Sequence, residues 1–233
     1  MRRTRVTDQV ADALTDAILS GEFPPGATLP PERDLARRFG VNRTTLRQSL
    51  SRLEQLGLVE VVQGRGTVVR DPASNPDPVL LGRMLPLSGP DLVGEVMELR
   101  EALLGWMAEL AARRARRRDL TRLERLVREV AAAETADECQ QRERDWFDAL
   151  ADTTRNRPLA LVLRWVWRAY EEVAPVFREA FGDPAVVASD LGRVTEAVSR
   201  RSPEEAGDEM RRYARRSAAR MEAVLRRSGP PAP

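Results

Sequence analysis

Hydrophobic residues recur at helical spacing through most of the first 57 positions of the chain. A first apolar stripe predicts a helix over residues 7–20, with Thr7 as its N-cap and Gly21 directly after its end. The proline-rich segment 23–31 excludes a helix and indicates a fixed loop. Apolar and charged positions then predict a second, short helix over residues 32–39.

The third predicted helix has two different faces. Asn42 is a good N-cap and Gly57 a good C′ residue. Between them an apolar stripe consists of Leu46, Leu50, Leu53 and Leu56. The first turns of the other face carry Arg43, Thr44, Thr45 and Arg47, which is suitable chemistry for a DNA major groove; an ordinary surface helix is the alternative. Because only a very short turn precedes Asn42, the second and third helices are predicted to form a helix-turn-helix.

A strand pattern follows the third helix. Residues 58–62 and 67–69 are rich in β-branched side chains, and Gln63, Gly64, Arg65 and Gly66 join them as a small, basic hairpin tip. The glycines of this tip could suggest a phosphate loop, but no helix follows them. A wing beside a DNA groove fits better, so residues 1–70 are predicted to form a winged helix-turn-helix domain with a two-stranded β wing.

The pattern becomes entirely helical after the wing. Residues 71–78 are rich in proline and small polar side chains, so residues 71–90 are predicted to be a linker with a short helix over 79–85. Residues 91–228 form the second predicted domain, an all-α bundle large enough for an internal ligand cavity, and residues 229–233 a disordered tail. The amphipathic runs of the second domain cover residues 91–116, 119–134, 137–154, 158–181, 184–200 and 203–227. Pro175 should kink or split the fourth run.

Composition narrows the class of protein. The chain has no histidine, the commonest general base and metal ligand, which disfavours an enzyme. Cys139 is the only cysteine, and no apolar run reaches the roughly 18 residues of a membrane span. The basic N-terminus leads into an amphipathic pattern, not a secretory signal, so a cytoplasmic protein without membrane contact is expected.

The basic excess lies with the predicted winged helix. Residues 1–70 carry 11 arginines against 8 acidic residues, whereas residues 71–233 carry 27 against 28. A local positive excess on a DNA-reading element is the distribution expected for nucleic-acid binding.

Several N-terminal segments carry a specific family resemblance. They are Phe23-Pro24-Pro25-Gly26, Leu29-Pro30-Pro31-Glu32-Arg33-Asp34-Leu35-Ala36, Phe39-Gly40-Val41-Asn42-Arg43-Thr44-Thr45-Leu46-Arg47, Leu53-Glu54-Gln55-Leu56-Gly57-Leu58-Val59 and Gly64-Arg65-Gly66-Thr67. Together they resemble the signature of GntR-family bacterial transcription regulators. The resemblance implies that the operator is contacted by Arg33, Arg43, Thr44, Thr45 and Arg47, and by Gln63, Gly64 and Arg65 of the wing.

Physical roles follow from side-chain chemistry. Arg43 and Arg47 lie one turn apart and can each read a guanine edge with two hydrogen bonds. Thr44, Thr45 and the helix N-terminus suit phosphate oxygens. Arg33 suits either role, with a salt bridge inside the domain as the alternative.

The second domain resembles the C-terminal domain of the FadR subfamily. The similarity lies in Glu98-Leu99-Arg100-Glu101-Ala102-Leu103, in Trp146-Phe147-Asp148-Ala149-Leu150-Ala151 and in Arg155-Asn156-Arg157-Pro158-Leu159. Most bundles of this kind hold a divalent metal with one Asp and three His. The corresponding positions here are Arg144, Asp148, Leu191 and Tyr213, so neither a metal nor any other cofactor is expected.

The resemblance to the metal-free branch of this subfamily implies an acyl-CoA effector. Predicted effector-binding residues are Arg100, Arg144, Asp148, Leu191 and Tyr213, and aromatic residues at helical spacing are available for an apolar tunnel: Trp106, Trp146, Trp165, Trp167, Phe177 and Tyr213. Ordinary core packing and buried ion pairs are the alternatives for these residues.

Three functional interpretations follow. The leading one is a transcription regulator that binds a palindromic double-stranded DNA operator as a homodimer, as the family resemblance implies, and responds to an acyl-CoA. A second keeps this architecture but senses a small organic or sugar acid through Arg100 or Arg144. A third is an enzyme or lipid carrier built on the helical half, which the absence of histidine disfavours.

Overall fold

The computed structural model describes residues 2–75, 77–84 and 90–228. The chain divides into two compact units, residues 1–88 and 89–233. The predicted tail, residues 229–233, lies outside the described residues.

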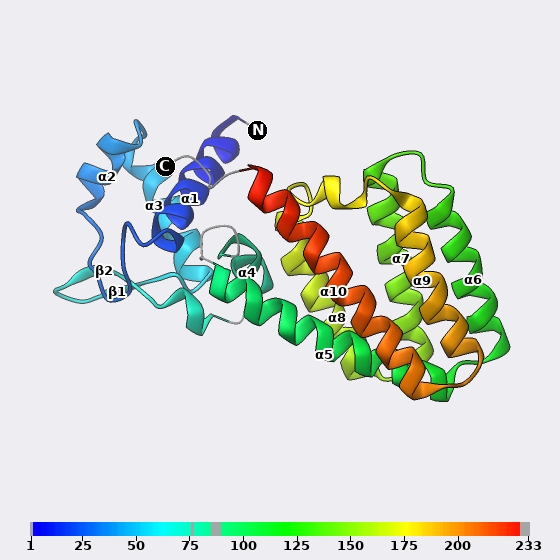
Figure 1. The fold of residues 1–233 in the computed structure, drawn as a ribbon. Helices are drawn as coiled ribbons and strands as arrows, with labels where there is room; N and C mark the ends of the chain where they lie inside the picture. Colours follow the sequence, from blue (N-terminus) through cyan, green and yellow to red (C-terminus); the bar gives the residue numbers. More distant parts are fainter. Residues whose placement is uncertain (1, 76, 85–89, 229–233) are drawn as a thin grey trace. The chain divides into compact units, whose positions relative to one another are not determined.

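The first unit is a winged helix-turn-helix (Figure 1). Its β wing is antiparallel, with Val59 opposite Val69 and Val62 opposite Gly66. The elements in chain order are α1 (Arg2–Leu19), α2 (Glu32–Arg38), α3 (Arg43–Gln55), β1 (Val59–Val62), β2 (Gly66–Val69), the short 3-10 helix η1 (Pro72–Ser74) and α4 (Pro78–Met84). The predicted fold class is confirmed for this half of the chain.

Helix α1 begins earlier than the sequence pattern predicts. Thr7 does not cap it, since the helix already runs from Arg2. No proline or glycine interrupts residues 2–6, and arginine is a good helix former, so nothing stops the helix from extending toward the N-terminus. The backbone carbonyl of Thr7 instead accepts a hydrogen bond from Ser49 Oγ of α3 at 2.9 Å.

One hydrophobic core holds the first unit together. Leu14 of α1, Leu46 and Leu53 of α3, and Leu58 before the wing are completely buried. Burying a leucine side chain stabilises a fold by roughly 1.5–3 kcal/mol, so these contacts fix α3 against α1. The opposite face of α3 carries the exposed side chains of Arg43, Thr44 and Arg47.

Part of the predicted linker belongs to this core. Leu80 of α4 is 2% exposed and packs in the same cluster as Leu14. Arg83 of α4 donates to Asp12 Oδ1 at 3.0 Å and to Asp16 Oδ1 at 2.7 Å, both on α1. Residues 78–84 are therefore a packed element of the first unit and not a free spacer.

The second unit is an all-α bundle, which confirms the fold class for the rest of the chain. Helices α5 and α10 lie side by side in it (Figure 1). The fourth predicted run is split as Pro175 requires, because α8 ends at Val173 and a 3-10 helix follows. The elements are α5 (Pro90–Arg114), α6 (Arg117–Ala131), α7 (Ala136–Thr154), α8 (Arg157–Val173), η2 (Arg178–Phe181), α9 (Pro184–Ser199) and α10 (Pro203–Ser228).

Side-chain oxygens cap several of these helices. Thr135 accepts from the backbone N–H of Glu138 at the start of α7, and Asn156 accepts from that of Leu159 at the start of α8. These caps satisfy backbone donors that have no partner within the helix. Local sequence therefore sets where these helices begin.

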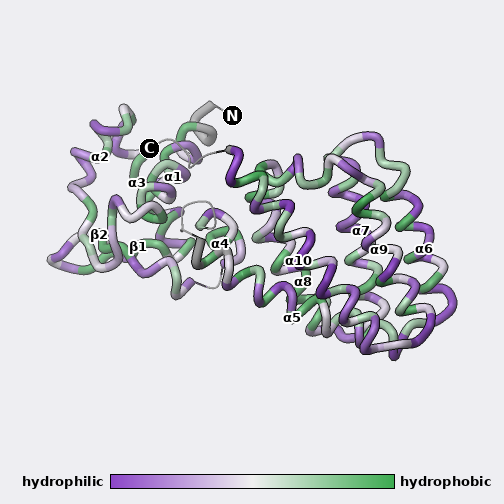
Figure 2. Tube along the Cα trace, viewed as in Figure 1, coloured by the Kyte–Doolittle hydropathy of each residue, from purple (hydrophilic) through white to green (hydrophobic). Residues whose placement is uncertain are grey.

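Aromatic side chains fill the core of the bundle. Trp146, Phe147 and Tyr213 are each at most 1% exposed, and the Phe147 ring lies 5.3 Å from that of Trp146 and 5.6 Å from that of Tyr213. Figure 2 shows that hydrophobic and hydrophilic residues alternate along the helices of this unit, as expected for helices that bury one face. Within the described residues, no helix combines the length and the apolar character that a membrane crossing needs.

Candidate DNA-binding surface and effector site

The N-terminal end of α3 presents two exposed arginines. Asn42 caps this end by accepting from the backbone N–H of Thr45 at 2.8 Å. Arg43 is exposed, and no ion pair joins it to any carboxylate of the described residues. Arg47 has a 72% exposed side chain, and its Nε lies 2.8 Å from Glu32 Oε2 of α2. Both guanidinium groups are thus accessible to a macromolecule.

The two threonines of α3 lie in different environments. Thr44 is exposed beside Arg43, whereas Thr45 is only 4% exposed. Thr45 lies next to Leu46 and one turn before Ser49, so the helix turns it toward the core. Only Thr44 presents its hydroxyl group on the arginine surface.

The remaining predicted DNA contacts are exposed around α3. Arg33 has a 69% exposed side chain, and its ion pair with Asp34 is long at 3.6 Å. Gln63, Gly64 and Arg65 are exposed at the wing tip. Arg65 Nη2 donates to the carbonyl of Gly26 at 2.8 Å, which ties the wing to the loop before α2.

Predicted effector residues meet in the interior of the second unit. Arg100 of α5 donates to the carbonyl of Ala214 and to Ser217 Oγ, each at 3.2 Å, and lies 5.6 Å from the centre of the Tyr213 ring. Tyr213 donates its hydroxyl hydrogen to the buried carboxylate of Glu143 on α7. These contacts join α5, α7 and α10 in one polar cluster.

Glu143 is the centre of this cluster. Burial raises the pKa of its carboxyl group above the usual value, and the hydrogen bond from Tyr213 lowers it. The positive charges of Arg100, Arg220 and Arg144 also lower the pKa of this carboxyl group. The charges of guanidinium groups on three helices therefore act on this carboxyl group.

The other predicted effector residues differ from one another in their exposure and contacts. Arg144 borders the cluster: its Nη1 lies 3.0 Å from Glu171 Oε1, and its guanidinium lies 5.5 Å from the Trp167 ring. Asp148 is exposed and accepts from Trp167 Nε1 at 3.2 Å. Leu191 is completely buried, and its side chain offers no polar atom to the cluster.

These residues do not fit a divalent metal. Arg144 places a positive charge where a cation would bind, Leu191 offers no ligand atom, and the Tyr213 hydroxyl is engaged by Glu143. Within the part of the chain that the structure describes, no three His, Cys, Asp or Glu residues are arranged to hold a metal ion.

Sequence reasoning missed Glu143 and Arg220. Glu143 interrupts the apolar stripe of α7, which otherwise contains Cys139, Trp146, Phe147 and Leu150. A single carboxylate in such a stripe could have been recognised from the sequence as a candidate polar site, because a buried charge needs a partner. Arg220 gives no comparable signal, since α10 carries many arginines.

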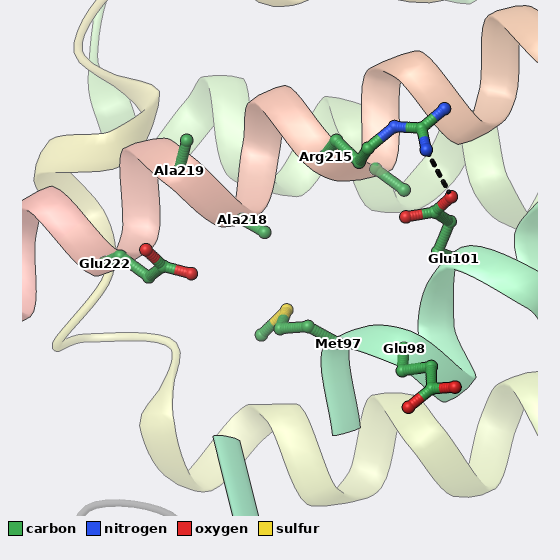
Figure 3. Close-up of a pocket in the computed structure, with 8 residues that line it drawn as sticks. Met97, Glu98, Glu101, Arg215, Ala218, Ala219 and Glu222 are labelled. Carbon is green, nitrogen blue, oxygen red and sulfur yellow. Dashed lines mark ion pairs between the residues drawn. The ribbon is translucent and has the colours of Figure 1, made fainter. Parts of the chain in front are cut away.

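A surface groove of about 210 Å³ runs between α5 and α10 (Figure 3). Met97 and Glu222 reach toward the same space, and Arg215 pairs with Glu101 at 2.9 Å at one end. None of the predicted effector residues lines it. The groove adjoins the polar cluster only at Ala214, whose carbonyl accepts from Arg100.

A winged helix with exposed arginines on α3, followed by an all-α bundle with a polar interior, defines a class of two-part DNA-binding regulators. Family models identify the two parts: residues 6–69 match the bacterial regulatory proteins of the gntR family, and residues 95–216 match the FCD domain. The chain belongs to the GntR family of transcription regulators and carries an FCD effector-binding domain.

Similar proteins support this membership along most of the chain. The uncharacterized HTH-type transcriptional regulator Rv0494 of Mycobacterium tuberculosis is 42% identical over 219 residues, which cover 94% of this chain and 90% of the relative. HTH-type transcriptional regulator Mce2R of the same species is 31% identical, with coverage of 86% and 85%. The matched families and relatives are transcription regulators and not enzymes.

A solved structure shows the same fold. Lar, which controls the expression of the Listeria monocytogenes agr system, has a TM-score of 0.60 at 17% identity, with 94% of this chain and 97% of Lar covered.

Proposed function

We propose that this regulator binds a palindromic operator as a homodimer and that a small molecule in its FCD domain controls the binding. The observation that carries the proposal is the pair of exposed arginines, Arg43 and Arg47, at the capped end of α3. A recognition helix reads only a few base pairs, so two copies are needed for a specific site. Thr44, Arg33 and the wing tip supply further contacts to the DNA backbone.

The effector belongs to one of two chemical classes. The FCD match, and the absence of a metal-ligand set among the residues that the structure describes, favour the metal-free FadR branch, which the sequence resembles, and hence an acyl-CoA. The arginines around Glu143 favour a small organic or sugar acid. Both classes act by changing the operator affinity, so effector and operator must affect each other's binding reciprocally.

A binding titration with the full chain tests the DNA-binding half of this proposal. The operator is first selected from a random DNA pool. Arg43→Ala and Arg47→Ala should each weaken binding, by about 1–3 kcal/mol for each lost guanine contact. Arg52→Ala in the same helix is the matched control, because Arg52 pairs with Asp8 of α1 and lies away from the helix N-terminus. Equal affinities of all three variants and the unmodified protein would exclude α3 as the recognition helix.

A further inference from the structure

Gln48 of α3 carries an exposed amide that is not among the predicted DNA contacts. It follows Arg47 directly in the sequence and lies one turn after Thr44. Residues four apart in a helix lie on one face, so Gln48 shares the exposed face of Thr44. The buried residues Leu46 and Leu50 lie on the other side of the helix. Gln48 therefore belongs to the same surface as the predicted DNA contacts of α3.

The neighbours of Gln48 leave its amide available. Among the described residues, the side chain has one hydrogen-bond partner, Thr7 of α1, whose Oγ1 donates to Gln48 Oε1 at 3.5 Å. This distance is near the upper limit for a hydrogen bond, so the contact holds the amide only weakly. Arg52, one turn further along α3, is instead paired with Asp8 of α1. Gln48 is therefore more readily available to a DNA base than Arg52 is.

The chemistry of an amide differs from that of the neighbouring side chains. The guanidinium groups of Arg43 and Arg47 only donate hydrogen bonds and suit guanine, whereas the hydroxyl of Thr44 discriminates little between bases. An amide offers an acceptor oxygen and a donor nitrogen side by side, which matches the N6 donor and the N7 acceptor of adenine in the major groove. Gln48 is the only amide in the first two turns of α3.

We propose that Gln48 is a specificity-determining residue that reads one adenine in each operator half-site, with Oε1 accepting from adenine N6 and Nε2 donating to adenine N7. The assignment rests on the proposed function, in which α3 is the recognition helix. An α-helix advances about 5.4 Å per turn, and base pairs are stacked about 3.4 Å apart. Side chains within one turn of each other therefore reach base pairs about one or two steps apart, so the adenine lies close to the guanine that Arg47 reads.

Selection of operator sequences from a random DNA pool tests this assignment with the full-length protein. The unmodified chain should select adenine at one position of each half-site, and Gln48→Ala should lose this preference and keep the others. Titrations with two duplexes, one with adenine at this position and one with another base, give the ratio of their affinities. Gln48→Ala should lower this ratio about 5- to 150-fold, since a bidentate base contact contributes about 1–3 kcal/mol of discrimination and about 1.4 kcal/mol corresponds to a factor of ten.

Two further variants complete the design. Gln48→Glu should change the selected base from adenine to cytosine, because a carboxylate only accepts hydrogen bonds and the N4 group of cytosine donates one. A purely structural role of Gln48 would not produce such an exchange. Gln55→Ala is the matched control, because Gln55 is an exposed amide of the same helix about two turns nearer its C-terminal end. Since both side chains are exposed, the substitutions should leave the fold intact.

Each result supports or overturns the assignment. Unchanged base preferences of Gln48→Ala, the same loss of preference in Gln55→Ala, or retention of adenine by Gln48→Glu would overturn it. A position that depends on Gln48 but selects a base other than adenine would contradict the adenine contact. Arg47→Ala in the same selection separates the two proposals. If Arg47→Ala alters the selected sequence and Gln48→Ala does not, only the role of Gln48 fails; if neither alters it, or no sequence is enriched, the proposed function fails.

Discussion

Arg47 of the recognition helix already has an acidic neighbour before any DNA is bound. Its Nε lies 2.8 Å from Glu32 Oε2, and both side chains are exposed. An exposed ion pair contributes only about 0–1 kcal/mol, so Glu32 orients Arg47 without holding it away from DNA.

Glu32→Ala should therefore change specificity more than affinity. Loss of the carboxylate leaves Arg47 free to adopt other rotamers and removes a negative charge that repels DNA phosphates. We expect non-operator binding to strengthen and the ratio of operator to non-operator affinity to fall about 3- to 10-fold, well within the discrimination of one bidentate contact. Fluorescence anisotropy with both DNAs at fixed salt measures this ratio; an unchanged ratio would show that Glu32 does not orient Arg47.

Cys139 should be inert in the native protein. It is completely buried, and burial raises the pKa of its thiol to about 12. Since the thiolate is the reactive form, iodoacetamide at pH 8 should label the protein only after denaturation in urea. Mass spectrometry gives a simple readout, because Cys139 is the only cysteine. Rapid stoichiometric labelling without urea would contradict the packing of α7.

Helices α5 and α10 make the most extensive contact among the described helices of the bundle, and Gly105 lies at a tight point of this contact. A Cβ atom on Gly105 of α5 would lie 2.6 Å from Arg211 Nη1 and 2.9 Å from Arg211 Cγ of α10. The contact includes the stem of the arginine, so the side chain cannot simply swing away. Arg211 is also paired with Glu109 at 3.2 Å.

Two alanine variants of α5 should have effects of opposite sign. Gly105→Ala should lower the free energy of unfolding by about 1–2 kcal/mol, because overpacking costs about 1–3 kcal/mol and the better helix propensity returns at most about 1 kcal/mol. Gly94→Ala meets nothing within 4 Å and should stabilise slightly. Urea denaturation measures both changes, and equal stabilisation by both substitutions would show that the α5–α10 contact is looser than described.

The ion pairs of Arg83 fix α4 to α1. Its side chain is 19% exposed and reaches Asp12 and Asp16 one turn apart. Arg83→Ala should increase amide hydrogen exchange in residues 78–84 and leave α3 unchanged, because the core of the first unit does not depend on the pair. Arg70→Ala is the control, because Arg70 is an exposed arginine of the same unit. Unaltered exchange in α4 would mean that Leu80 alone holds the helix.

Sequence patterns predict the elements better than their long-range partners. Asn42 and Gly57 set the ends of α3 by local backbone chemistry, which can be read directly from the chain. The polarity of Thr45 predicts a position on the DNA surface. The structure instead buries Thr45 on the core side of the helix. The contact between Glu143 and Tyr213 joins residues 70 positions apart, and only the packing of α7 against α10 creates it.

At the scale of the whole molecule, two copies of the chain should bind one operator. DNA selected from a random pool should contain an inverted repeat whose half-sites are centred one helical turn, about 10 base pairs, or a multiple of this apart. Mass photometry should give two protein chains per DNA duplex, and a duplex with one half-site destroyed should bind more weakly. Tight binding of one chain to one half-site would contradict the homodimer.

The packing of α4 against α1 determines where the DNA-binding half must end when it is joined to the effector domain of another regulator. A DNA-binding module cut after residue 70 would lack Leu80 and Arg83, so it would expose part of the core around Leu14 and leave Asp12 and Asp16 without the arginine that joins them. The exchangeable module therefore extends at least to Met84. A chimeric sensor that joins this winged helix to another effector domain should keep α4 with the DNA-binding half.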